Sequence, residues 1–157
     1  MIRPETPTNA GFSKIAFALP PDEGEWEHLW AAPLDEKLVY RVDSIPLHVF
    51  GLASDDVVRA RSENGHLTFD SVLRRGGHST YRIAPVPTAS HQRLHDLLGR
   101  LQRLGCEMER SASGRLIAID VPPTTDIYAV YAVLQEGLDD GTWWFDEMHV
   151  GHKLRES

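Results

Sequence analysis

The sequence predicts an α+β protein in which a small antiparallel β-barrel or strongly curved sheet packs on a second lobe of four strands and two helices. Two observations predict it. Short runs of alternating apolar residues, separated by turn residues, fill residues 13–79. After residue 80, strand patterns alternate with two helical repeats of apolar residues. A chain of 157 residues has room for two small lobes that share contacts.

The N-terminal half begins with a stretch rich in Pro, Thr and Asn, for which we expect a disordered arm over residues 1–12. Each strand pattern after it is bounded by Pro, Gly, Asp or Asn, which favour turns. The patterns occupy residues 13–19, 26–31, 38–42, 57–61 and 67–73. Five or six short strands in about 75 residues are typical of a small barrel or curved sheet.

The second strand carries two tryptophans on one face. Trp26 and Trp30 flank His28 at alternating positions. Aromatic pairs at this spacing usually belong to the core face of a sheet, and we expect that here rather than a ligand site. The short apolar run at residues 47–51 is either a connecting strand or a covering loop.

The hairpin over residues 57–73 has the clearest local signal. Asn64-Gly65 between two alternating runs favours a tight β-turn. Strict alternation places Leu67, Phe69 and Leu73 on one face. Before the hairpin, we expect a carboxylate of Asp55-Asp56 to cap the loop amides.

The C-terminal half follows the order β-α-β-β-α-β. Leucines recur at helical spacing up to residue 104, and Gly105 is a suitable residue to end that helix. A second helix is predicted to run to about residue 138. The predicted strands cover residues 80–86, 106–110, 115–121 and 142–149. This order matches the ferredoxin-like arrangement.

The predicted organisation is therefore an arm (1–12), a β lobe (13–79), a ferredoxin-like lobe (80–150) and a tail (151–157). Because Gly76-Gly77 offers no linker between the lobes, we expect one compact unit.

Composition excludes several partners. A formal net charge of −7 argues against binding a nucleic-acid backbone. No apolar run approaches the roughly 20 residues that cross a bilayer, so we expect no membrane partner. The single cysteine, Cys106, is expected in the core, and without a secretory signal it favours the cytoplasm. A Trp-rich edge strand leaves the oligomeric state open.

The densest cluster of polar side chains starts the second half, at residues 78–82. Alternation along a strand puts His78, Thr80 and Arg82 on one side, where the histidine could act as acid or base and the arginine could hold an anion. Asp70 is a further candidate. Ser79 points the other way, so a Ser79–His78 nucleophile pair is not expected. The alternative is that Gly76-Gly77 is a turn followed by ordinary strand residues.

No cofactor or metal site is expected. Glu147, His149 and His152 have the spacing E-x-H-x-x-H, which matches no strong metal signature. The phosphate-binding glycine loops, the nucleophile elbow and the C-x-x-C motif are all missing from the sequence.

Six stretches together resemble an uncharacterised bacterial family, the domain of unknown function numbered 4265. The stretches are FALPP (17–21), WxxLWA (26–31), YRVDSIP (40–46), GLAxxDVV (51–58), RGGHSTYR (75–82) and HVGH (149–152). The resemblance implies a bacterial cytoplasmic setting and no particular catalytic residue.

Two functions remain. The first is a non-enzymatic protein-binding module, such as a bacterial immunity or inhibitor protein that covers a basic partner, which the small size and acidic charge favour. The second is a small-molecule binder or small acid–base enzyme that uses a cleft between the lobes, with His78, Thr80, Arg82 and Asp70 as its residues.

Overall fold

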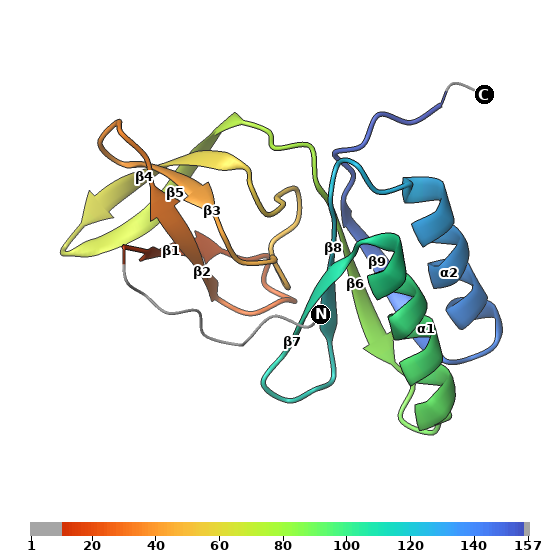
Figure 1. Cartoon of the computed structure of the whole chain (residues 1–157). Coiled ribbons are helices and arrows are strands. Elements are labelled where there is room, and N and C mark those ends of the chain that lie inside the picture. The colour runs from red at the N-terminus through yellow and green to blue at the C-terminus, as the bar shows by residue number, and fades with distance from the viewer. Residues whose placement is uncertain (1–10, 156–157) are drawn as a thin grey trace.

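The computed structural model describes residues 11–155, which form two lobes that lie side by side (Figure 1). Most of the arm expected at residues 1–12 lies outside the described residues. The α+β class is confirmed. None of the helices within residues 11–155 is both long and apolar enough to cross a bilayer.

The N-terminal lobe is a closed barrel of five strands. They are β1 (Ser13–Ala18), β2 (Trp26–Pro33), β3 (Val39–Val42), β4 (Val57–Glu63) and β5 (His66–Arg74). Neighbours along the chain pair antiparallel. The pair that closes the barrel, β1 with β5, is parallel, with Ile15 opposite Leu67. The sequence predicts antiparallel pairing throughout the barrel, and this prediction is wrong for the β1–β5 pair.

The tryptophans of β2 lie outside the barrel, so their predicted place in the core is wrong. Leu29 and Ala31 point inward and are buried. Trp26 is 51% exposed, and Trp30 lies under the ammonium of Lys14 from the neighbouring strand, 5.0 Å from its ring centre. The inward face of β2 therefore consists of the smaller residues between the aromatic ones.

A bulge in β5 changes which residues face the core. Arg59 pairs with Ser71 but Ala60 pairs with Phe69, so β5 has one extra residue, Asp70, at this point. Beyond a bulge the alternation shifts by one. Val72 consequently packs on the core, whereas Leu73, predicted to be inside, is 46% exposed.

The C-terminal lobe has a four-stranded sheet in the order β7-β8-β6-β9, covered on one face by two helices (Figure 1). Its elements are β6 (Ser79–Pro85), α1 (His91–Leu104), β7 (Glu107–Arg110), β8 (Ile117–Val121), α2 (Ile127–Asp139) and β9 (Trp143–His149). Ser90 caps the start of α1 through its hydroxyl, and Gly105 ends it with a φ of 113°. These boundaries agree closely with the predicted repeats.

The two faces of this sheet differ in chemistry. Tyr81, Ile83 and Ile119 point to the helices and belong to a closed apolar core. Cys106 is in that core as predicted, and burial raises the pKa of its thiol to about 12. The opposite face, which meets the barrel, carries polar side chains of β6, β8 and β9.

The segment between β3 and β4 covers that polar face. Residues 47–51 form no strand, so of the two alternatives the covering loop is correct. The amide of Gly51 donates to the carbonyl of Met148 (3.0 Å), and Leu47 offers its carbonyl to Arg82 (3.2 Å). Barrel and sheet are thus joined by loop backbone as well as by side chains.

Candidate functional site

The junction of the two lobes holds three of the four candidate residues. Thr80 and Arg82 project from β6 toward the barrel, and His78 directly precedes the strand. All three are largely buried. The spacing that alternation predicts therefore brings them into one row, at the place where a cleft was expected.

His78 is held between two carboxylates. Its Nδ1 lies 2.9 Å from Asp120 Oδ2 on β8, and its Nε2 lies 3.3 Å from Asp55 Oδ2. The hydrogen bond to Asp120 is the main reason that the pKa of His78 is raised, against the opposing effect of burial. A cationic imidazole here ties the sheet to the loop before β4.

Arg82 is engaged just as fully. Its guanidinium donates to Glu23 Oε1 (2.6 Å), to Asp146 Oδ2 (2.8 Å) and to the carbonyl of Leu47, and it lies over the ring of Phe50. The hydrogen bond from Arg82 is the largest influence on the pKa of Glu23, which is lowered. A guanidinium with these contacts is a poor clamp for an incoming anion.

Thr80 and Ser79 also bond within the chain. The Thr80 hydroxyl donates to the carbonyl of Leu52 (3.3 Å). Ser79 Oγ lies 2.6 Å from His152 Nδ1 and accepts from the amide of Gly151 (2.9 Å). His152 Nε2 lies 2.9 Å from the carbonyl of Pro122, as in an oriented Ser–His pair.

That Ser79–His152 pair is nevertheless closed to substrate. Ser79 is fully buried, and its oxygen is occupied by the imidazole and by two backbone amides, those of Gly151 and His152. A nucleophile must reach the reacting carbon, and this one faces protein on every side. The pair fastens the C-terminal segment to β6.

Asp70 is not part of the junction. It sits at the bulge of β5 on the outer barrel surface, with Ser71 Oγ at 3.1 Å and Arg61 Nε at 3.9 Å. The structure therefore groups His78, Thr80 and Arg82 but leaves the fourth candidate elsewhere.

Asp56 also lies at the junction, where the sequence predicts only a carboxylate that caps the loop amides. It is fully buried; Oδ2 accepts from the Ala53 amide (3.0 Å) and from Arg75 (2.9 Å), and Oδ1 accepts from the Gly76 amide (3.0 Å). The expected capping of loop amides before β4 is confirmed for this carboxylate. Its link to residues 75–76 could not be read from the sequence, because it depends on how the lobes fold together.

The E-x-H-x-x-H run does not converge on a metal. Both ring nitrogens of His152 lie within hydrogen-bond distance of protein oxygens, those of Ser79 and Pro122. The pKa of His149 is lowered, mainly because the side chain is partly buried. Within residues 11–155 no three side chains of ligand type gather at one point. Every buried side-chain polar atom of the same residues has a hydrogen-bond partner.

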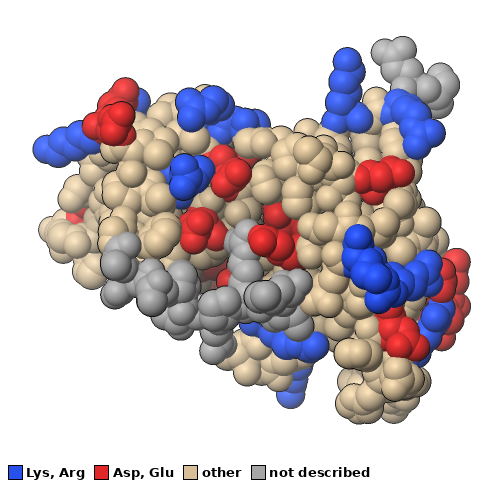
Figure 2. Space-filling model, viewed as in Figure 1, with Lys and Arg blue, Asp and Glu red and all other residues tan. Residues whose placement is uncertain are grey.

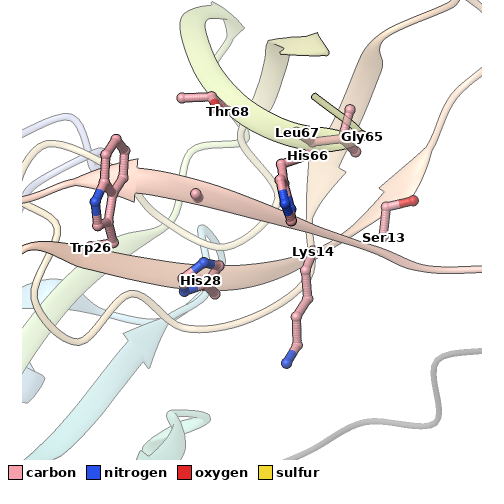
Figure 3. Close-up of a pocket in the computed structure, with 9 residues that line it drawn as sticks. Ser13, Lys14, Trp26, His28, Gly65, His66, Leu67 and Thr68 are labelled. Atoms are coloured by element: carbon pink, nitrogen blue, oxygen red, sulfur yellow. The ribbon is translucent and has the colours of Figure 1, made fainter. Parts of the chain in front are cut away.

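A hollow of about 630 Å³ lies instead on the outside of the barrel, over β1, β2 and β5 (Figure 3). Its floor follows from the strand register: Ala16, a small residue in the middle strand, pairs with His28 on one side and Thr68 on the other. Larger side chains around a small one leave a depression.

The rim of this hollow carries aromatic and cationic groups. Trp26 and His28 stand on β2, His66 starts β5, and Lys14 lies on β1 between the two outer strands (Figure 3). An exposed indole with imidazoles beside it offers flat apolar surface and hydrogen-bonding edges. Exposed aromatic residues of this kind are enriched at protein contacts.

The sequence contained only part of the signal for this hollow. The sequence shows Trp26 and His28 on one face of a predicted strand, but this spacing is equally typical of a strand face that points into the core. Lys14 and His66 become their neighbours only through the parallel β1–β5 pair, whose register puts Lys14 beside His66. That pairing has no local sequence signature.

The hollow over β1, β2 and β5, called the barrel hollow below, differs in charge from the junction of the lobes. Figure 2 shows acidic side chains gathered on this face where the two lobes meet. The hollow, by contrast, is lined by no carboxylate.

Three comparisons with other proteins bear on identity. The family model described as Domain of unknown function (DUF4265) matches residues 27–145, which confirms the resemblance read from the motifs. A crystal structure of a hypothetical protein from Neisseria gonorrhoeae has a TM-score of 0.77 and 19% identity, over 90% of this chain and 97% of that one. This likeness shows the fold alone. None of the curated proteins matches the chain.

Proposed function

The chain belongs to the family described as Domain of unknown function (DUF4265), and since that membership carries no activity we propose that the protein is a non-enzymatic protein-binding module. Its contact surface is the barrel hollow edged by Trp26, His28 and His66. The observation that carries this proposal is the exposed Trp26, a large apolar side chain beside a hollow on an otherwise well-packed barrel.

The lining determines what the hollow would bind. Lys14 and two histidines favour a neutral, aromatic or acidic side chain at the point of contact. The formal net charge of −7 acts at longer range and favours a partner whose overall charge is positive. An immunity- or inhibitor-type protein that covers one such partner is the form of this proposal that both charges allow.

The alternative, a small-molecule site between the lobes, has weaker support. His78 and Arg82 use their hydrogen bonds and charge on Asp120, Asp55, Glu23 and Asp146. An enzyme at this junction would have to break those contacts before it bound a ligand. We infer that the row of polar residues holds the lobes together.

We also propose a fold type for the C-terminal lobe. The strand order β7-β8-β6-β9, with the connections β-α-β-β-α-β, supports a ferredoxin-like C-terminal lobe. We propose that the C-terminal lobe serves as a scaffold for the barrel. The polar face of its sheet is covered by the barrel, so the outer barrel surface is the one that a partner can contact.

The test is capture of the partner followed by mutation. The full chain, tagged and expressed in its own organism, is expected to purify with one protein near one-to-one. Trp26→Ala should abolish that co-purification. Trp144→Ala is the matched control, because Trp144 is 68% exposed but lies on β9 of the other lobe. Loss of the partner in both variants, or in neither, would contradict the proposal.

A further inference from the structure

A second hollow lies in the C-terminal lobe, at the end of the sheet where β6 leads into α1. It has a volume of about 840 Å³ and is bounded by residues 84–89, the first two turns of α1 and the β7–β8 hairpin. Small-molecule sites commonly have volumes of about 300–1,000 Å³. No residue of this hollow belongs to the barrel.

The floor and the rim of this hollow differ in character. Leu94, Leu98 and Leu116 give it an apolar floor. Arg110 and Arg115 stand at the two ends of the hairpin loop, and Figure 2 shows basic side chains at the lower end of the molecule, where Figure 1 places that hairpin. His91 and His95 add two imidazoles one helical turn apart on α1.

Arg110 and Arg115 lack the carboxylate partner that most other arginines in the described part of the chain have. Arg41, Arg59, Arg75, Arg82, Arg93 and Arg100 each have a carboxylate within 4 Å. Within residues 11–155, Arg110 and Arg115 form no such pair, and no carboxylate lines their hollow. In a chain of net charge −7, this is a local excess of positive charge.

We propose that this hollow binds a small amphipathic anion, an apolar body that carries a carboxylate or a phosphate. The anionic group would lie between Arg110 and Arg115, because a guanidinium offers parallel N–H donors to two oxygens of such a group. The apolar body would cover the leucine floor. The site is independent of the barrel hollow and of its partner.

The probes are octanoate and octyl phosphate, added to the full-length protein and followed by changes in amide chemical shifts. We expect saturable shifts confined to residues 84–98 and 110–116. The more tightly bound of the two identifies carboxylate or phosphate as the preferred group. 1-Octanol, which has the same apolar body without charge, should bind at least about tenfold more weakly.

The variants test the arginines directly. Arg110→Gln with Arg115→Gln should weaken binding of the better probe by at least about tenfold. Arg74→Gln with Arg103→Gln removes two arginines that also lack an ion pair within residues 11–155 and lie outside this hollow, and should change affinity by less than about twofold.

Two results would overturn the proposal. One is the absence of saturable shifts in this hollow with either probe. The other is unchanged affinity in the Arg110/Arg115 variant, provided that its spectrum shows a folded protein. Probe binding that survives Trp26→Ala separates this site from the proposed partner surface.

Discussion

His78 Nδ1 lies 2.9 Å from Asp120 Oδ2, across the pair of strands that carries the polar face of the sheet. The histidine lies before the first strand of the C-terminal lobe, and the aspartate lies on the central strand β8. With Asp55 on the other side of the ring, the contact joins both lobes. His78, which the sequence suggests as an acid or base, thus forms part of a structural connection.

This connection gives the stability a pH dependence with a definite sign. The hydrogen bond to Asp120 raises the pKa of His78 in the folded protein. Its contribution is therefore fully present below the ordinary histidine pKa of about 6.5 and is lost as pH rises through the folded value. We expect the free energy of unfolding of the wild type, relative to His78→Gln, to fall from pH 6 to pH 8.5, measured with urea.

The comparison with His78→Gln isolates this group. Glutamine can still donate a hydrogen bond but cannot become a cation. His149, whose pKa is lowered, acts in the opposite direction and contributes equally to both proteins. A difference between wild type and variant that stays constant with pH would refute the role of the charged imidazole.

Asp56 should matter far more to stability than Asp70. Asp56→Ala leaves the amides of Ala53 and Gly76 and the Arg75 side chain without the carboxylate that accepts from them. We expect a loss of about 3 kcal/mol in the free energy of unfolding. Asp70→Ala, on the outer surface, should cost less than about 0.5 kcal/mol. If urea unfolding gave equal losses of unfolding free energy for the two variants, the buried Asp56 carboxylate would not be what joins residues 53 and 76.

The two aspartates also show what the sequence could and could not provide. Local patterns predicted both helices, the Asn64-Gly65 turn and nearly every strand, because these depend on neighbours a few residues apart. The prediction that places Asp70 at the junction is wrong, because the bulge at this residue depends on the register with β4. The prediction that places Trp26 in the core is wrong, because the alternation of residues is the same on either face of a barrel wall. The carboxylate partners of His78 and Arg82 lie 23–64 residues away in the sequence, so only the structure identifies them.

Two helical glycines should respond oppositely to alanine. A Cβ on Gly137 of α2 would lie 2.3 Å from Trp143 Cε2, a buried ring whose indole N–H donates to the carbonyl of Leu134. Gly137→Ala should cost at least about 2 kcal/mol despite the better helix propensity of alanine. Gly99→Ala on α1 meets only the flexible end of Arg103 and should gain up to about 1 kcal/mol. Thermal or urea unfolding of both variants measures this, and stabilisation by Gly137→Ala would rule out the packing described.

Ser79 should hold the C-terminal segment in place. Its hydroxyl bonds His152 and accepts from the amides of Gly151 and His152. Ser79→Ala removes all three bonds, so we expect faster hydrogen exchange at these two amides, with little change in the helices. Ser111→Ala, in the β7–β8 loop, is the control. Unchanged exchange in Ser79→Ala would mean that other contacts hold this segment.

The affinity of the captured partner for purified variants tests the proposed function most directly. Titration calorimetry of Trp26→Ala should give a dissociation constant at least about tenfold higher than that of the wild type, as loss of a central aromatic contact does. Trp144→Ala should agree with the wild type within about twofold. A Trp26→Ala protein that is folded and binds the partner as tightly as the wild type would contradict the barrel hollow as the contact surface.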